Sequence, residues 1–376
     1  MEVTLSEELA AVAELARSLG LGKLSPAARS AESGGPVDVS LWRALTDSGL
    51  VAPMRAEHGG DGLIDAVTDM VAAENLAYGD PGIAFAALCS GAAATLLSRH
   101  GTPEQAERAR RLTSDATARG SIALYEAFGR GPDEWTTSIS DVDGRITVRG
   151  TKVAAPFAAA AEAIIVVGTD PATGTLRAAV VPRDAAGVSL EPAYGAIALG
   201  ETASRVVHFD VTLPGDAALG GGLLDPAALA VDVERIRLLV GAIAVGTGQR
   251  AIDYASAYAT ERIAFGHPIA GFQGVSFLLA EKQMTIEAAR LEVAEAASAA
   301  DAGGTSAADV NSLRLAVRDA VNYATDAAAM ATRDAVQVLG GHGFLLDHPV
   351  ELWYRSAAAL AAMDFDPLCS AFAPAV

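Results

Sequence analysis

The spacing of apolar residues changes twice along the chain and divides it into three parts. In residues 1–118, apolar side chains recur every three or four positions, over segments joined by short loops. This period is typical of helices with one buried face. Thr102, which precedes Pro103, can cap the start of the last of these helices. The others are predicted at Leu5–Leu19, Val37–Leu50, Leu63–Tyr78 and Ile83–Leu97.

Residues 119–217 show a different pattern, in which alternating or β-branched runs are separated by turn residues. Asp143-Gly144 lies between two such runs, and this dipeptide favours the tight turn of a β-hairpin. The predicted strands are Ser121–Leu124, Arg145–Arg149, Ala163–Val167, Leu176–Val181 and Val206–Phe209. We therefore predict a central β domain that is barrel-like or a sandwich.

The helical period returns in residues 218–376 and extends over longer segments. Gly246 and Gly248 in the first segment would let a neighbouring helix approach closely. The predicted helices are Leu229–Thr260, an element with an apolar stripe from Phe272 to Val293, Ala307–Gln337 and Val350–Ala362. The expected fold class is α+β, with an N-terminal helical domain, the β domain, and a C-terminal four-helix bundle that mediates oligomerisation.

Composition and charge limit the classes of partner. Hydrophobic residues make up 51% of the chain but aromatic residues only 5%, which favours helices rich in aliphatic side chains. The net charge of −19 disfavours nucleic acids and anionic membranes as partners. The two cysteines and the histidines lack metal-ligand spacing, so we expect no metal. The acidic start does not resemble a secretory leader, and we expect a cytoplasmic protein without a membrane span.

Three sets of short strings in the sequence then point to a family. The first is Arg262-Ile-Ala-Phe265-Gly266-His-Pro268-Ile269 with Phe272-Gln273 after it. The second is Gln337-Val-Leu-Gly340-Gly341-His-Gly343-Phe344, and the third is Glu57-His-Gly59-Gly60-Asp-Gly62 with Ala77-Tyr78-Gly79-Asp80-Pro81. In this order and spacing they resemble the acyl-CoA dehydrogenases over nearly the whole chain. The resemblance implies FAD as cofactor and the oxidation of an acyl-CoA thioester to its 2,3-enoyl form.

The resemblance also assigns residues that complete the FAD site of a neighbouring subunit. An arginine can donate two charge-assisted hydrogen bonds to a pyrophosphate, and glutamines offer neutral donors and acceptors. Glycines have no Cβ and let a cofactor approach the backbone. The residues in question are Arg262, Phe265, Gln273, Gln337, Gly340 and Gly341. The neighbour is either a second copy of this chain, in a dimer or tetramer, or a homologous subunit.

The part of the FAD site that each chain of this family builds for itself departs from the family pattern. Glu126 is retained, but Ala127-Phe128 replaces the family's Pro-Gly. After Lys152-Val153 the family has Trp-Ile-Thr, where this chain has Ala154-Ala155-Pro156. Loss of the indole that covers the flavin forfeits about 0.5–1.5 kcal/mol of aromatic stacking. We therefore expect that this chain's own flavin site is eroded.

Two carboxylates are candidates for the base that takes the α-proton. The usual family position corresponds to Asp364, where an aspartate resembles the nitroalkane oxidases. Glu234 matches an alternative position that members with bulky or branched acyl groups use, steroid-side-chain enzymes among them. Asp232 and Arg235 would then meet the CoA moiety or hold the base. The alternative for Glu234 is a helix ion pair with Arg237 or Arg235.

Three functions remain open from the sequence. The first is an acyl-CoA dehydrogenase of lipid metabolism, with Glu234 as base. The second is the partner subunit of a heteromeric dehydrogenase, as in steroid-degrading heterotetramers, which completes the FAD site of a homologous chain while its own site stays empty. The third is a related flavin oxidase or monooxygenase with Asp364 as base.

Overall fold

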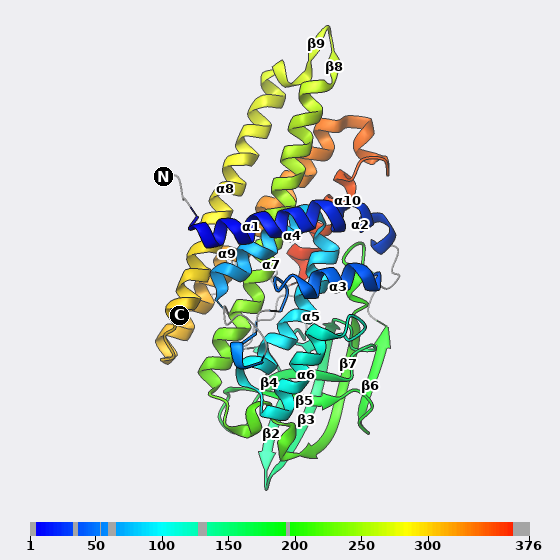
Figure 1. Cartoon of the computed structure of the whole chain (residues 1–376). Helices are drawn as coiled ribbons and strands as arrows, with labels where there is room; N and C mark the ends of the chain where they lie inside the picture. The colour runs from blue at the N-terminus through cyan, green and yellow to red at the C-terminus, as the bar shows by residue number, and fades with distance from the viewer. Residues whose placement is uncertain are drawn as a thin grey trace.

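A computed structural model describes residues 5–32, 37–52, 54–58, 65–126, 134–192 and 196–363. The candidate base Asp364 and the substituted pair Ala127-Phe128 lie outside these ranges. In Figure 1 the sheet lies at the bottom, the N-terminal helices cross the middle, and the long C-terminal helices extend to the top. The order helical, β, helical agrees with the predicted α+β class.

The N-terminal helices begin where their sequences provide caps. The Thr102 side chain accepts from the backbone N–H of Gln105, and the Gln105 side chain accepts in return from the backbone N–H of Thr102. This capping box confirms the predicted start of that helix. The helices are α1 (Glu7–Leu19), α2 (Ser25–Glu32), α3 (Val39–Asp47), α4 (Ala66–Gly79), α5 (Pro81–His100) and α6 (Pro103–Ser114), with a π turn at Gly20–Leu24.

Helix α5 is the one described helix whose length and composition would let it cross a membrane. It lies inside the molecule, however, and 89% of its apolar window is buried. Asp80 caps it by accepting from the N–H of Ile83 at 2.8 Å. Its side chains pack on the sheet and on the C-terminal helices, so that Leu96, Ile165 and Leu229 share one core cluster. Because this core is continuous, the boundaries at residues 118 and 217 stay predictions.

Within the described residues, the central strands form one seven-stranded mixed sheet, in the order β1-β4-β2-β3-β7-β6 with β5 added to β4. The predicted hairpin is confirmed: β2 and β3 pair antiparallel, and Asp143 and Gly144 both have left-handed φ angles, 52° and 71°. The strands are β1 (Ile122–Ala123), β2 (Ser138–Val142), β3 (Arg145–Ala155), β4 (Ala163–Thr169), β5 (Leu176–Pro182), β6 (Val188–Pro192) and β7 (Arg205–Pro214).

The C-terminal helices form the predicted bundle. A Cβ at Gly246 would overlap the carbonyl oxygen of Glu74, and one at Gly248 would overlap the side chain of Ile286. Both glycines therefore permit close helix contact, as predicted. The elements are α7 (Pro226–Glu261), the short strands β8 (Ile263–Ala264) and β9 (His267–Pro268), α8 (Gln273–Ala302), α9 (Ala307–Leu339) and α10 (Val350–Met363). The β8–β9 hairpin lies at the end of the molecule opposite the sheet (Figure 1).

Candidate functional site: two half-sites at opposite ends

An open hollow of about 450 Å³ lies at the free end of the bundle, where α7 and α9 end. Arg262, Gly340 and Gly341 line it together with Tyr258 and His342. The structure thus brings together three of the residues predicted to complete a partner's FAD site, although they come from strings far apart in the chain. We call this region the tip hollow.

Arg262 supplies the positive charge of the tip hollow. Its backbone N–H donates to the carbonyl of Tyr258 at 2.8 Å and ends α7, while its carbonyl accepts from Ile269 at 2.9 Å. Its side chain is exposed and, among the described residues, forms no hydrogen bond or ion pair. A guanidinium anchored by its backbone and lacking a carboxylate partner suits an anionic ligand.

The glycines of the tip hollow differ in what they require. Gly340 has a φ of 58°, and this left-handed backbone conformation is by itself enough to favour glycine at the position. Gly341 has no left-handed φ, and a Cβ there would meet no atom within 4 Å. Nothing in the described chain therefore demands glycine at position 341. A bound group that comes close to the backbone would demand it.

The other three predicted cofactor residues lie near this end but outside the lining of the tip hollow. Phe265 and Gly266 form the β8–β9 turn with φ angles of 52° and 91°, and the Phe265 side chain is 94% exposed. Gln273 begins α8 and Gln337 lies in the last turn of α9, and both are exposed. A phenylalanine held in a strained turn and fully exposed is typical of a contact with another molecule.

Behind the tip hollow lies a ring cluster that the sequence did not indicate. The Tyr258 hydroxyl lies 3.0 Å from Nδ1 of His342, and the Tyr254 hydroxyl lies 2.8 Å from Nδ1 of His348. The two histidine rings are 5.5 Å apart. The spacing of Tyr254 and Tyr258, one turn apart on α7, was the only sequence signal. The cluster fixes the loop after α9 against α7.

The second half-site lies on the sheet, around Glu126 and Lys152. The Lys152 ammonium is fully buried and donates to Oε1 of Glu126 at 3.0 Å and to the carbonyl of Leu124 at 2.8 Å. Glu126 also accepts from the backbone N–H groups of Thr136 at 2.6 Å and Thr137 at 2.7 Å. Burial opposes the charge on Glu126, but Lys152 and these N–H groups outweigh it and lower the pKa of Glu126 to about 2.

Where the family has an indole over the flavin, β3 ends without an aromatic ring. Ala154 has a φ of 50° and is only half-buried, and Pro156 has no N–H to donate. The next ring along the chain, Phe157, is buried edge-on against Trp42 with centroids 5.6 Å apart. The described part of this half-site therefore keeps its ion pair, but the end of β3 carries no aromatic ring at the position of the family's indole.

Glu234 is completely buried on α7, and arginines hold it. Nη1 of Arg237 lies 2.5 Å from its Oε2, and Nε of Arg314 on α9 lies 3.5 Å from its Oε1. This is the ion pair named above as the alternative to a catalytic role. A carboxylate stabilised by two cations is a weak base until one of them moves. The role of Glu234 as base stays a prediction.

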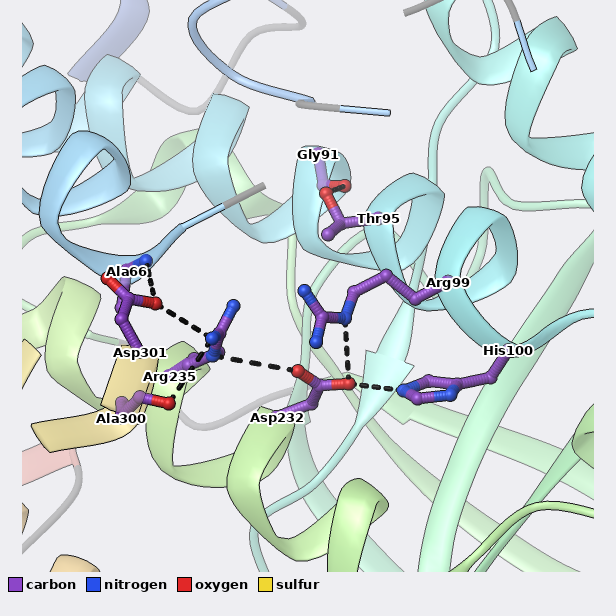
Figure 2. Close-up of polar contacts among 9 residues, drawn as sticks. All are labelled: Ala66, Gly91, Thr95, Arg99, His100, Asp232, Arg235, Ala300 and Asp301. Carbon is purple, nitrogen blue, oxygen red and sulfur yellow. Dashed lines mark hydrogen bonds and ion pairs between the residues drawn. The ribbon is translucent and has the colours of Figure 1, made fainter. Parts of the chain in front are cut away.

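Asp232 and Arg235 belong to a separate network on another face of α7 (Figure 2). Figure 2 shows Asp232 between Arg235 on one side and Arg99 and His100 of α5 on the other. Asp232 accepts from Nε of Arg99 at 3.2 Å and contacts His100, and Arg235 donates to Asp301 at 2.8 Å. Residues two apart on a helix point about 200° apart, so Glu234 and Asp232 do not share a site.

The described residues contain no group of three or more histidines, cysteines, aspartates or glutamates that could hold a metal ion. The Cys89 thiol is shielded, and burial raises its pKa to about 12. At neutral pH the thiol therefore stays protonated, and the thiol is a poorer nucleophile than the thiolate.

Comparisons with known proteins identify the family to which this chain belongs. The family models described as "Acyl-CoA dehydrogenase, N-terminal domain" and "Acyl-CoA dehydrogenase, C-terminal domain" match residues 6–112 and 227–364. The probable acyl-CoA dehydrogenase YngJ of Bacillus subtilis is 28% identical over 95% of this chain and 94% of its own length. The short-chain specific acyl-CoA dehydrogenase of Megasphaera elsdenii is 29% identical over 92% of this chain and 91% of its own length.

Solved structures give the same result at the level of the fold. Butyryl-CoA dehydrogenase from Megasphaera elsdenii superposes with a TM-score of 0.82 at 25% identity, over 99% of this chain and 98% of its own. The prolyl acyl carrier protein oxidase AnaB superposes with a TM-score of 0.83 at 21% identity, over 98% of each chain, which shows a shared fold. This chain therefore belongs to the acyl-CoA dehydrogenases, a family of FAD-dependent oxidoreductases that act on the CH–CH bond of acyl-CoA.

Proposed function

We propose that this chain is a subunit of a FAD-dependent acyl-CoA dehydrogenase, in which its tip hollow completes the FAD site of a second chain of the same fold. The observation that carries the proposal is the position of Arg262. Arg262 ends α7 beside the β8–β9 hairpin, and this hairpin lies opposite the sheet, whose strand β3 carries Lys152, the partner of Glu126 (Figure 1). A composite FAD site built from these two halves needs two chains.

The residues of the tip hollow fit a dinucleotide. The Arg262 guanidinium would pair with the pyrophosphate, and the backbone at Gly341 would face the cofactor without steric hindrance. FAD, when bound, would accept the hydride from the β-carbon of the acyl group. The exposed Phe265 and Phe344, at 94% and 78%, would become buried against the second chain.

The sheet half-site supports an asymmetric assembly. It lacks the stacking ring at Ala154, and the buried Glu234 is already paired with Arg237. We infer that the second chain is a homologous subunit with its own intact flavin cradle, in a heterotetramer, and that a cytoplasmic location goes with this function. A bulky or steroid-type acyl group is the finer part of the proposal. It rests on Glu234 at the position that members with bulky or branched acyl groups use, and on the small side chain of Ala154; Ala155 adds no space because it is buried in the core of the sheet.

A second candidate is a homomeric enzyme in which Glu234 is the base. The complete burial of this carboxylate favours the second candidate, because burial in a water-poor site is one of the ways in which enzymes shift the pKa of a general base. In that case Arg237 or Arg314 would have to leave Glu234 before it could accept a proton.

Purification with flavin spectroscopy separates the two candidates. If the proposal is right, the chain expressed alone carries little FAD, and co-expression with a homologous subunit gives about one FAD for each pair of chains. Arg262→Ala should then lower the FAD content of the complex. A yellow homotetramer with one FAD for each chain would contradict the heteromeric assembly and support the homomeric enzyme.

A further inference from the structure

A small cavity outside both half-sites lies between α4, α5 and α7. Its volume is about 40 Å³, which leaves room for about three water-sized groups, since one water occupies roughly 10–15 Å³ on the same measure. One wall is aliphatic and the other carries charged side chains. The aliphatic wall consists of Leu50, Val51, Leu88, Ala92, Leu96, Ile236 and Leu239.

The arginines of the charged wall already contact carboxylates (Figure 2). Arg99 donates to Asp232 at 3.2 Å, and Arg235 donates to Asp301 at 2.8 Å. Asp301 in turn accepts from the backbone N–H of Ala66 at 2.8 Å, which fixes the start of α4. The positive charges of this wall are therefore matched before any ligand enters.

Asp69 is the exception in this cavity. Its side chain lines the cavity from α4 and, among the described residues, forms no hydrogen bond and no ion pair. Asp65, the N-cap residue of the same helix, adds a further negative charge while its Oδ1 accepts from the N–H of Thr68 at 2.7 Å. An aspartate that lines a small cavity without a direct hydrogen-bond or ion-pair partner is costly to keep ionised.

We propose that this cavity is a binding site for a small primary ammonium group on a short aliphatic chain, with Asp69 as its counter-ion. An ammonium group has three donors and one positive charge, which match an unpaired carboxylate. The attached carbons would pack on the aliphatic wall of Leu88, Ala92 and Leu239. An anion would meet Asp69 with the wrong charge, and a neutral alcohol would gain only a weaker hydrogen bond. The proposal does not depend on FAD chemistry.

The ionisation of Asp69 supports the same assignment. Burial raises the pKa of Asp69 to about 7, and the carboxylates of Asp65 and Asp301 add to this rise, while Arg235 and Arg99 oppose it. A cation in the cavity would stabilise the ionised form. Ammonium binding should therefore strengthen about tenfold between pH 6 and pH 8, as Asp69 loses its proton. Asp232 also lines this wall and contacts His100, so a variant must separate the effects of these two residues from that of Asp69.

The experiment compares three probes of matched size on the purified full chain: ethylammonium, ethanol and acetate. Dissociation constants come from saturation-transfer NMR at constant ionic strength. We expect ethylammonium to bind at least about tenfold more tightly than the other two, because charge-assisted hydrogen bonds are about twice as strong as neutral ones. Equal affinity for ethanol, or tighter binding of acetate, would overturn the proposal.

Two variants test the role of Asp69, and one serves as control. Asp69→Asn keeps the shape of the side chain and should abolish both the preference for ethylammonium and its rise with pH. Asp65→Asn removes a nearby charge but keeps a side chain that can cap α4, and should change the affinity less than about twofold. An equal loss in both variants would show a general electrostatic effect and overturn the site. Ala92→Leu fills the cavity while keeping Asp69, and should also abolish binding.

The ammonium could belong to a free amine or to the acyl group of a thioester. A second comparison, of β-alanyl-CoA with propionyl-CoA, distinguishes these sources. Tighter binding of β-alanyl-CoA in the wild-type chain, lost in Asp69→Asn, assigns the site to the acyl group. A preference for free ethylammonium without this difference assigns it to a small amine. If neither preference is observed, the proposal is contradicted, whatever the FAD content of the preparation.

Discussion

Nη1 of Arg237 lies 2.5 Å from Oε2 of Glu234, and both side chains are buried inside the bundle. The two residues are one turn apart on α7, while Arg314 reaches the same carboxylate from α9. Arg314 therefore links α9 to the pair on α7 at the position where the family resemblance places a base. A carboxylate cannot serve structure and proton transfer at once without a change in its arginine contacts.

Replacement of this carboxylate should destabilise the fold. Glu234→Gln removes the buried negative charge that Arg237 and Arg314 share, and we expect the free energy of unfolding to fall by about 3–5 kcal/mol. Urea denaturation measures this. The control is Asp210→Asn, which breaks the exposed pair with Arg149 and should leave stability unchanged within error. A loss below about 1 kcal/mol for Glu234→Gln would show that the arginines do not depend on Glu234.

The buried pair of Glu126 and Lys152 should limit stability in acid. The folded-state pKa of Glu126 is lowered to about 2, from an ordinary value of 4.5. Its stabilising effect is therefore complete above pH 4.5 and is lost as the pH falls towards 2. The shift corresponds to at most about 3 kcal/mol. Glu126→Gln should flatten this part of the profile in urea denaturation, whereas Glu162→Gln at an exposed carboxylate should leave it unchanged.

Asp69 should have the opposite effect on stability. Its folded-state pKa is raised from 3.8 to about 7, so the unfolded chain releases the proton first as the pH rises. The free energy of unfolding should therefore fall between about pH 4 and pH 7, by at most about 1.4 kcal/mol for each pH unit, and then stay constant. Asp69→Asn should remove this fall and unfold at a higher temperature than wild type at pH 7.5. If Asp69→Asn is less stable than wild type at pH 7.5, the raised folded-state pKa of Asp69 is contradicted.

Gly341, in the tip hollow, and Gly246, between packed helices, should respond differently to substitution by alanine. Gly341→Ala adds a Cβ that meets no atom within 4 Å, so the isolated chain should keep its melting temperature. The FAD content of the two-chain complex should nevertheless fall. Gly246→Ala places a Cβ on the carbonyl oxygen of Glu74 and should lower the melting temperature by several degrees. Unchanged FAD content in Gly341→Ala would remove position 341 from the cofactor site.

Much of the fold could be predicted from the sequence because it depends on local rules. The helical period, the cap at Thr102 and the turn at Asp143-Gly144 involve residues close together in the chain, and the structure confirms them. The prediction that Gly246 and Gly248 permit close helix contact is also confirmed. Glycine destabilises the interior of a helix, so its presence there indicates a close approach of another element. The sheet order was not predictable, because strand pairing such as that of β1 with β4 depends on contacts distant in sequence.

The site was only partly predictable for the same reason. The family strings identified Arg262, Gly340 and Gly341 by residue type, but only the fold brings them to one hollow at the end opposite the sheet. Glu234 and Asp232 are only two positions apart on α7, but the structure gives them different partners: Arg237 pairs with Glu234, and Arg99 pairs with Asp232.

The sequence by itself therefore determined most of the helices and strands, the family and the chemical types of the candidate residues, because these follow from local spacing and composition. The tertiary structure decided which of these residues share a surface and which charges are already matched. Glu234 proved to be paired with Arg237, while Asp69, which the sequence did not single out, has no partner among the described residues. Both results depend on burial and on side chains from different helices, and a linear pattern contains neither.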